Sequence, residues 1–281
     1  MTGWSLLARG DIVAPMADPC AWIFDPPLVP GRLVQRENRF IAEVELEDGR
    51  RVKAHSTNTG SLMGVTSPGR RVYLRPEPQG PGLPPRRTAY TWVLVRHGHN
   101  WVGVDTMLPN RLGFQAARAR ALPGLEGYSE VLREVPYGAG SRVDLLLRDP
   151  GPGSLPDCYV EIKNCHLTAS TLDPGIAGPR VPARRGGRLV RDIALFPDAP
   201  TERGRKHLRE LAKVASRGHR AMLLVVVQRS DVDAFAPAAG IDPEYASLLA
   251  EVVSQGVEVQ AWACNVSPQK LRLARPLRVL F

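Results

Sequence analysis

The stretch that decides the fold reads Arg142-Val-Asp-Leu-Leu-Leu147, then a turn, then Asp157-Cys-Tyr-Val-Glu-Ile-Lys163. Both runs are apolar enough to form central strands. Because side chains alternate across a strand, Glu161 and Lys163 project from one face, while the apolar residues between them pack on the other. If the strand that contains Asp144 runs alongside, two carboxylates and one ammonium group converge at one place in the sheet.

This set of two acids and a lysine is what metal-assisted hydrolysis of a phosphodiester requires. Asp144 and Glu161 are the predicted ligands of one or two hard cations, Mg²⁺ or Mn²⁺, and the Ile162 carbonyl completes the set. Lys163 is predicted to orient the attacking water or to balance the charge that develops on the phosphate. The alternative is that Glu161 and Lys163 face solvent, because an acidic and a basic residue two apart on a strand are common there.

The connection between the two runs, Asp149-Pro-Gly-Pro-Gly-Ser154, has the composition of a turn. It allows a hairpin that would place the two acids side by side. The dipeptide Pro156-Asp157 is similar to the first motif of restriction-type nucleases, but it lies too close to Glu161 to come from a separate strand. Asp144 is therefore the better candidate for the first acid.

Composition and charge restrict the class of protein. The chain has 281 residues, of which 43% are hydrophobic and 23% charged, which is typical of a soluble globular protein with one large domain or two ordinary ones. The formal charge of +9 and the pI near 9.8 indicate a polyanionic partner, and DNA is the expected one. Codon usage in a GC-rich genome is an alternative source of part of the arginine excess.

The sequence predicts neither a membrane segment nor a zinc site. The start of the chain has no basic region before an apolar stretch, and the longest apolar run, residues 221–227, is too short to span a bilayer. Cys20, Cys158, Cys165 and Cys264 form no C-x-x-C pair, so buried free thiols are expected. We therefore expect a cytoplasmic protein that does not bind membranes.

The chain divides into three parts of a mixed α/β (α+β) protein. Residues 1–27 are predicted to be a partly ordered extension, residues 28–100 a small β-rich domain and residues 101–281 a larger α/β domain. Turns at Asp48-Gly49 and Pro68-Gly69 separate short strands in the small domain, which favours an OB-like barrel. The expected strands are residues 31–36, 39–46, 51–55, 71–75 and 90–95.

The barrel domain is rich in arginine. Basic residues beside aromatic ones would suit neutralisation of a nucleic-acid backbone together with stacking on bases. A solvated, arginine-rich surface is the alternative. The basic residues are Arg36, Arg39, Arg50, Arg51, Arg70, Arg71, Arg86 and Arg87, and the aromatic ones are Tyr73, Tyr90 and Trp92. The predicted DNA contacts among them are Arg36, Arg39, Arg86 and Arg87.

The larger domain alternates strands and helices. Asn110 is predicted to cap its first helix, and two further helices should start after Thr201 and at Asp242. The helix after Thr201 should turn an apolar stripe inward and Arg203 and Lys206 outward, and we predict that these two contact DNA, because a helix N-terminus attracts phosphate. The expected strands are residues 130–137, 142–148, 157–164, 221–228 and 257–263.

Several motifs occur in a fixed order along the chain. They are His55-Ser-Thr-Asn-Thr-Gly60, Thr91-Trp92, Asp105-Thr106 with Asn110-Arg111-Leu112, Asp157-Cys-Tyr-Val-Glu-Ile-Lys163, and Phe196-Pro-Asp-Ala-Pro-Thr-Glu-Arg-Gly204 with His207-Leu-Arg-Glu-Leu211. Taken jointly they resemble the sugar fermentation stimulation protein A (SfsA) family. The resemblance covers the chain from about residue 28 to its end.

This resemblance implies an OB-fold followed by a domain similar to PD-(D/E)XK restriction endonucleases, with DNA binding as the activity. It places Asp144, Glu161 and Lys163 in the acid, acid and lysine roles, and Glu134 in the role of the upstream acid that some of these nucleases carry. The family name reflects a carbon-metabolism phenotype and implies no mechanism. The motif residues left without a role are His55, Asn58, Thr59, Gly60, Asp198 and Thr201.

Residues 168–195 depart from the family pattern, because this Pro/Gly-rich stretch is longer than the family leads us to expect. It reads as a flexible basic loop beside the predicted site, which either clamps DNA or is disordered. Its charged residues are Arg180, Arg184, Arg185, Arg188 and Arg191 against Asp173 and Asp192.

Two classes of function follow. The first is a metal-dependent nuclease that binds DNA without sequence preference. The second is a non-enzymatic DNA-binding regulator linked to sugar metabolism. The sequence favours the first, because both acids and the lysine are present and a degenerate domain would be free to lose them. No glycosidase acid pair or phosphate-binding loop supports a sugar-converting enzyme.

Overall fold

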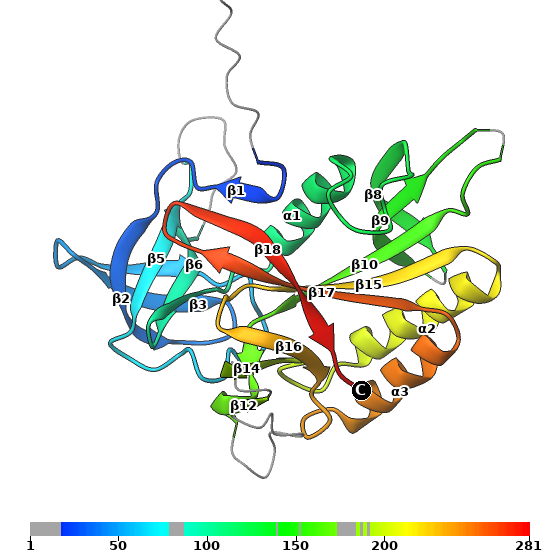
Figure 1. Cartoon of the computed structure of the whole chain (residues 1–281). Helices are drawn as coiled ribbons and strands as arrows, with labels where there is room; N and C mark the ends of the chain where they lie inside the picture. Colours follow the sequence, from blue (N-terminus) through cyan, green and yellow to red (C-terminus); the bar gives the residue numbers. More distant parts are fainter. Residues whose placement is uncertain are drawn as a thin grey trace, which may run out of the picture.

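The computed structural model describes residues 18–78, 87–138, 140–151, 153–172 and 192–281, together with the backbone of residues 184–185 and 188–189. Within these residues the chain forms a small β-barrel beside a larger α/β domain with a mixed sheet (Figure 1). Each part has an apolar core of its own, and the strands of the larger sheet position the candidate site.

The barrel is a sheet that closes on itself. Its strands are β2 (Val29–Arg36), β3 (Ile41–Leu46), β4 (Arg51–His55), β5 (Arg71–Pro76) and β6 (Tyr90–His97). They follow the order β4-β3-β2-β5-β6, and a parallel pairing between β4 and β6 closes the ring. β7 (Asn100–Gly103) continues the sheet beyond β6. The five strands expected from the sequence are those of the barrel.

Trp92 lies in the core of the barrel. Its side chain is fully buried, and its indole N–H donates to the Leu94 carbonyl at 3.0 Å. The expectation that Trp92 stacks on a nucleic-acid base is therefore wrong, because β6 is buried on both of its faces. Tyr73 also packs within the protein, with its ring edge-on to Trp101 at a centroid distance of 5.0 Å.

The larger sheet has ten strands. They are β1 (Ala21–Ile23), β8 (Glu130–Tyr137), β9 (Ser141–Arg148), β10 (Cys158–Cys165), β11 (Leu167–Thr168), β14 (Asp192–Phe196), β15 (Arg220–Val227), β16 (Val232–Pro237), β17 (Glu258–Val266) and β18 (Lys270–Val279). Nine follow the order β11-β14-β16-β18-β17-β15-β10-β9-β8, and β1 pairs with β18 off this path. β10 and β15 are parallel, whereas β8, β9 and β10 form an antiparallel meander.

Two short segments complete the strand and turn structure. A 3₁₀ turn spans Ala169–Thr171, and β12 (Arg184–Arg185) pairs antiparallel with β13 (Arg188–Leu189). These elements lie in the stretch 168–195 for which the sequence predicts a loop, and β11 and β14 overlap its two ends. The side chains of its five arginines lie outside the described residues, so the choice between a clamp and a passive insertion stays open.

Helices cover both faces of the large sheet (Figure 1). α1 (Met107–Arg118) packs on one face, against a core that includes Val160 and Ile162. α2 (Glu202–Ser216) and α3 (Pro243–Ser254) lie next to each other on the opposite face. The Thr201 hydroxyl accepts from the Gly204 amide and Asp242 accepts from the Tyr245 amide, so both predicted starts are confirmed as N-caps.

The prediction that Asn110 caps the first helix is wrong. α1 begins at Met107, whose amide donates to Asp105 Oδ1 at 3.0 Å. A carboxylate two residues ahead of the helix therefore satisfies an amide of the first turn, and Asn110 is free to point elsewhere.

α2 has the amphipathic pattern that the sequence predicts. Leu208, Leu211 and Val214 are buried, whereas Arg203 and Lys206 are exposed. The cysteines also agree with expectation, because all four are free thiols and three of them are buried.

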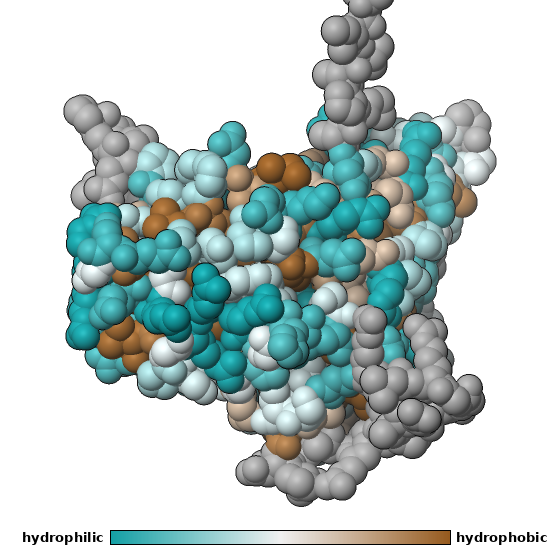
Figure 2. All heavy atoms as spheres, turned by 60° about the vertical axis from the view of Figure 1, so that its left-hand side comes forward, coloured by the Kyte–Doolittle hydropathy of each residue, from teal (hydrophilic) through white to brown (hydrophobic). Residues whose placement is uncertain are grey.

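One face of the molecule is mostly hydrophilic. Figure 2 shows polar residues over most of the face that carries the barrel, with apolar residues scattered among them. Within the part of the chain that the structure describes, no helix has the length and hydrophobicity needed to cross a membrane.

Candidate active site

Asp144 and Glu161 come together where β9 and β10 diverge. The antiparallel pairing of these strands ends at Leu145 and Val160, so the two acids are the next residue on each strand. Beyond this point the Ile162 amide donates to Asp144 Oδ2 at 2.6 Å. A side chain of β9 thus inserts at the point where the ladder opens, and the two carboxylates become neighbours.

Helix α1 fixes the other oxygen of Asp144. The Asn110 side-chain amide donates to Asp144 Oδ1 at 2.7 Å. The carboxyl group is therefore held at both oxygens, once from the strand and once from the helix. This is the role that Asn110 plays instead of the predicted cap.

Glu161 is buried and lies on the face of β10 that α2 covers. Its Oε1 accepts from Lys163 Nζ at 2.6 Å and makes a short contact with His207 Nδ1 on α2. Lys163 Nζ also lies 3.3 Å from His207 Nδ1. Glu161 Oε2 is buried and has no hydrogen-bond partner among the described residues. One oxygen of Glu161 is therefore neutralised, and the other is left for a ligand.

The two carboxyl groups differ in their electrostatics. Burial raises the pKa of Asp144 to about 6, and the negative charge of Glu161 adds to the shift. Burial also acts to raise the pKa of Glu161, but hydrogen bonding to His207 and Lys163 and their positive charge outweigh it and lower that pKa below its usual value. Lys163 and His207 therefore favour the ionised form of Glu161, whereas Asp144 is left with a raised pKa.

Two tyrosines enclose the site. Burial raises the pKa of Tyr137, and the charges of Glu161, Glu210 and Asp144 raise it further. Burial and Glu161 likewise raise the pKa of Tyr245. Neither hydroxyl has a hydrogen-bond partner among the described residues. The tyrosines therefore stay neutral and can donate to an anion or to water that enters the site.

The donor set suits a hard divalent cation. Carboxylate oxygens predominate, one of them unpaired, and such ligands favour Mg²⁺, Mn²⁺ or Ca²⁺ over zinc. Among the described residues no group of three or more acidic, histidine or cysteine side chains is already arranged as a metal cage. A cation would therefore need backbone and water ligands beside the two acids. The Ile162 carbonyl stays the predicted backbone ligand.

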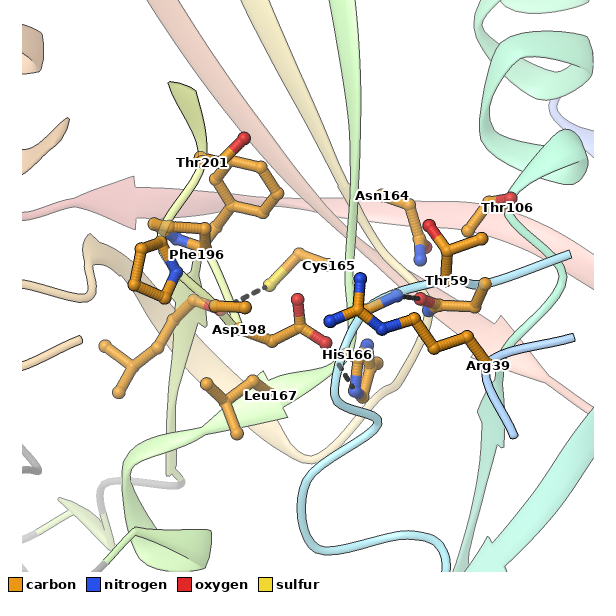
Figure 3. Close-up of a pocket in the computed structure, with 16 residues that line it drawn as sticks. Arg39, Thr59, Thr106, Asn164, Cys165, His166, Leu167, Phe196, Asp198 and Thr201 are labelled. Carbon is orange, nitrogen blue, oxygen red and sulfur yellow. Dashed lines mark hydrogen bonds and ion pairs between the residues drawn. The ribbon is translucent and has the colours of Figure 1, made fainter. Parts of the chain in front are cut away.

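A second polar cluster lies at the far end of β10, where the barrel meets the larger domain (Figure 3). His166 is buried, and its Nε2 lies 3.9 Å from Asp198 Oδ2. Asp198 also bridges the two domains, because its carboxylate accepts from the Ser61 hydroxyl and the Leu62 amide of the barrel. Asp198 therefore helps to join the two domains. This role could not be inferred from the motif alone.

The turn at residues 58–61 packs closely against Asp198. Asn58 Oδ1 accepts from the Gly60 amide at 2.9 Å, and the Arg36 guanidinium donates to four carbonyls in and around the turn. A side chain at residue 60 would place its Cβ 2.5 Å from Asp198 Oδ2. Glycine is therefore required there by close packing, since no positive φ is recorded for it.

The structure separates the other predicted site residues. Glu134 is exposed on β8 and has a positive φ of 52°, and its role as an upstream acid stays a prediction. His55 lines a different hollow, together with Arg87. The Arg36 guanidinium donates hydrogen bonds to backbone carbonyls of the protein. Arg39, Arg87, Arg203 and Lys206 are exposed. Arg86 lies outside the described residues.

Sequence reasoning missed His207, Asn110 and Glu210 as members of the site. His207 and Asn110 are in the motifs quoted above, so the signal was present, but nothing in a motif says which side chain reaches which carboxylate. Glu210 is also in a quoted motif. It follows His207 by one helical turn on α2, is buried, and its charge acts to raise the pKa of Tyr137.

Comparison with known proteins decides the family. The model of the "Sugar fermentation stimulation protein RE domain" matches residues 107–191 and 185–270, and that of the "SfsA N-terminal OB domain" matches residues 34–104. The chain belongs to the sugar fermentation stimulation protein family. Homologs of this name from Geobacter sp. (strain M21) and Rhodospirillum centenum are 44% and 42% identical to it. Their alignments cover 90% and 91% of this chain and 97% and 98% of theirs.

A solved structure supports the same fold. The SfsA protein of Pyrococcus furiosus, solved in complex with Ca²⁺, superposes with a TM-score of 0.74 at 28% identity. The match covers 91% of this chain and 97% of the other. The predicted fold class, an OB barrel followed by a mixed α/β domain, is thereby confirmed.

Proposed function

We propose that this member of the SfsA family binds DNA and hydrolyses its phosphodiester bonds with a divalent cation held by Asp144 and Glu161. The observation that carries the proposal is the pair of neighbouring carboxyls, the half-buried Asp144 with its pKa raised to about 6 and the buried Glu161 with an unpartnered oxygen. Buried like charges are costly, and a divalent cation bound between them would offset that cost.

Each residue of the site has a part in this mechanism. A bound cation would polarise the phosphate and lower the pKa of a water molecule. Asp144, held by Asn110 and the Ile162 amide, keeps its carboxylate oriented without rearrangement. Lys163, which now bonds Glu161, would turn its ammonium group toward the attacking water or the developing charge on the phosphate.

His207 is the residue that would take over when Lys163 turns away. It contacts the same oxygen of Glu161 from α2, so Glu161 keeps a partner while the lysine serves the substrate. This contact would hold the carboxylate in one orientation, as hydrogen-bond partners of metal ligands commonly do.

Three further observations support the DNA and cation parts of the proposal. The chain carries a formal charge of +9, and Arg39, Arg87 and Arg203 are exposed on its surface. The P. furiosus SfsA structure was solved with Ca²⁺, a cation of the class that two carboxylates favour. Mg²⁺ or Mn²⁺ is the cofactor we expect for cleavage.

A non-enzymatic DNA-binding role is the second candidate. It is favoured by the fact that both oxygens of Asp144 and one oxygen of Glu161 already have partners within the protein. A site satisfied in this way is stable without a cation and could be retained for its fold alone. DNA binding is common to both candidates, so cleavage is what separates them.

The test is cleavage of end-labelled single-stranded, duplex and branched DNA with Mg²⁺, Mn²⁺ or EDTA. We expect cleavage only with a cation, and a loss of at least about a hundredfold in Lys163→Ala and Glu161→Gln, because each removes a group that acts on the charged transition state. Lys270→Ala is the matched control, since Lys270 is exposed on β18 and should leave the rate unchanged.

The outcomes are distinct. DNA binding without cleavage by the wild-type protein under any of these conditions would leave the regulator. Cleavage that survives in Lys163→Ala and Glu161→Gln would place the activity in another protein of the preparation.

A further inference from the structure

The second polar cluster lines a cavity of about 340 Å³ at the end of β10 (Figure 3). The barrel contributes its turn at residues 58–60, and the larger domain contributes residues 164–167 and 195–201. Its volume falls within the usual range of small-ligand pockets, about 300–1,000 Å³. Phe196 and Leu167 provide apolar wall, and His166, Asp198 and Asn164 provide polar groups.

His166 indicates what kind of ligand the cavity accepts. The residue is 3% exposed, and its Nε2 has no hydrogen-bond partner among the described residues. The distance of 3.9 Å to Asp198 Oδ2 is too long for a hydrogen bond. An unpaired buried nitrogen costs about 1–3 kcal/mol, so a bound group that pairs with it would be favoured.

The imidazole is also uncharged at neutral pH, because burial lowers the pKa of His166 to about 4. It would therefore pair with a polar but neutral group rather than hold a phosphate by charge. Asp198, in the same cavity, can accept from an amino or imino N–H. A flat ring that offers both donors and acceptors along one edge, as a nucleobase does, matches this combination.

The mouth of the cavity favours a phosphate next to that ring. Arg39 is exposed and reaches over the cavity from the barrel side (Figure 3). Thr201, the N-cap of α2, lies on the other side, where backbone amides of the first helical turn attract negative charge. The cavity thus combines the neutral imidazole of His166 and the Asp198 carboxylate inside with the Arg39 guanidinium at its rim.

β10 connects this cavity with the candidate active site. Lys163 lies on β10 and His166 directly follows the last residue of that strand, so the two are three residues apart, which corresponds to at most about 10 Å of extended chain. A DNA strand with a rise of about 3.4 Å per nucleotide covers this distance within about three nucleotides. A base that is paired in a duplex cannot enter such a cavity, whereas an unpaired or extruded one can.

We infer that the cavity between the barrel and the larger domain binds one unpaired nucleobase of the DNA strand whose phosphate lies at Asp144 and Glu161. The inference rests on the proposed function and adds its substrate class, which is DNA with an unpaired nucleotide close to the scissile bond. The base lies against Phe196, its edge pairs with His166 and Asp198, and Arg39 contacts its phosphate.

Binding to Asp144→Asn protein, which removes cleavage from the measurement, tests the inference by fluorescence anisotropy. Three DNAs of equal length are compared: a full duplex, the same duplex with one unpaired nucleotide, and the single strand. We expect the unpaired nucleotide to strengthen binding about tenfold over the full duplex, since stacking of a base on an aromatic ring contributes about 1–3 kcal/mol. Placing 2-aminopurine at the unpaired position should report its burial as a change in fluorescence.

A variant of the rim supplies the matched comparison. Thr59→Phe fills the mouth from an exposed position on the turn and should reduce the ratio of the two affinities to about one. Ser67→Phe adds the same ring at an exposed position of the barrel outside the cavity and should leave the tenfold ratio unchanged.

Equal affinities for the full and the interrupted duplex, or an unchanged ratio in Thr59→Phe, would overturn the inference while DNA binding itself stands. Failure to bind any of the three DNAs would remove the proposed function as well. A deoxynucleoside monophosphate that binds more tightly than the interrupted duplex would identify a free nucleotide as the ligand and overturn the assignment to a DNA strand.

Discussion

The two polar clusters on β10 differ in the charge that they bury. At the middle of the strand, Asp144 lies beside Glu161, Lys163 and His207 bond Glu161, and burial raises the pKa of Asp144. At the end of the strand, His166 is buried as a neutral ring and its pKa falls. The first cluster therefore joins two acids whose ionised forms a cation would favour, and the second holds a neutral imidazole whose Nε2 has no hydrogen-bond partner among the described residues.

We therefore propose that the first cluster carries out the chemistry and that the second recognises the substrate. Two neighbouring carboxylates are what metal-assisted hydrolysis uses, whereas the second cluster combines the neutral imidazole of His166 with the Asp198 carboxylate, which suits the acceptors and donors along the edge of a base. The clusters also differ in what joins them to the fold. The first is held by α1 and α2 of the larger domain, and the second depends on contacts that cross to the barrel.

The largest expected effect is the response of the first cluster to pH and to metal. The native pKa of Asp144 is raised from 3.8 to about 6, so its ionisation costs stability above pH 6, and the cost disappears below about pH 4. The free energy of unfolding of the wild-type protein should therefore rise by up to about 3 kcal/mol, relative to that of Asp144→Asn, as the pH falls from 7 to 4.

Mn²⁺ should oppose this trend. It binds the ionised carboxylate, so it should raise the melting temperature of the wild-type protein at pH 7, have less effect at pH 5 and have none on Asp144→Asn. Urea unfolding at each pH and thermal unfolding with and without Mn²⁺ measure both effects. An equal response of the two proteins to pH would show that Asp144 titrates normally.

The second cluster should respond to volume instead of charge. In Gly60→Ala the new methyl group would lie 2.5 Å from Asp198 Oδ2, and Asp198 cannot withdraw easily because Ser61 and Leu62 hold it. We expect a loss of about 1–3 kcal/mol in the free energy of unfolding. Gly151→Ala is the control, since a Cβ there meets nothing within 4 Å.

A double-mutant cycle assigns the cause of that loss. Gly60→Ala should cost less in the Asp198→Ala background, because the clash is then absent. If the two losses add without coupling, the contact between residue 60 and Asp198 is not what requires glycine.

Much of this architecture could be predicted from the sequence, because it depends on local patterns. The alternation in β9 and β10 and the caps at Thr201 and Asp242 are properties of a few adjacent residues, and they were predicted correctly. β18 was missed although leucines alternate with basic residues along much of its length, so its signal was present.

The contacts that complete the site could not be predicted in this way. His207 reaches Glu161 across 46 positions of sequence, and this contact depends on how α2 packs over the sheet. Asn110 was assigned to a cap because its residue type suits one, but the Asp105 side chain starts the helix earlier and leaves Asn110 for Asp144. Trp92 was assigned to the surface because strand alternation does not reveal a strand that is buried on both faces.

The smallest expected effect concerns the surface that connects the two clusters. Arg203 is exposed on the first turn of α2, between Thr201 at the rim of the cavity and His207 at the candidate active site. A DNA strand that passes from one to the other would place a phosphate near it. Each phosphate contact contributes about −0.9 to the slope of log affinity against log salt concentration. Arg203→Ser should therefore flatten this slope by about one unit and weaken binding to all sequences alike.

Arg217 provides the matched control, because it is an exposed arginine at the opposite end of the same helix. Arg217→Ser changes the net charge by the same amount but lies away from the proposed path, so its salt slope should remain that of the wild-type protein. Neither substitution should change the free energy of unfolding by more than about 0.5 kcal/mol, as is usual for exposed residues. Equal flattening by both variants would mean that DNA responds to the overall charge of the protein rather than following a path from the cavity to the active site.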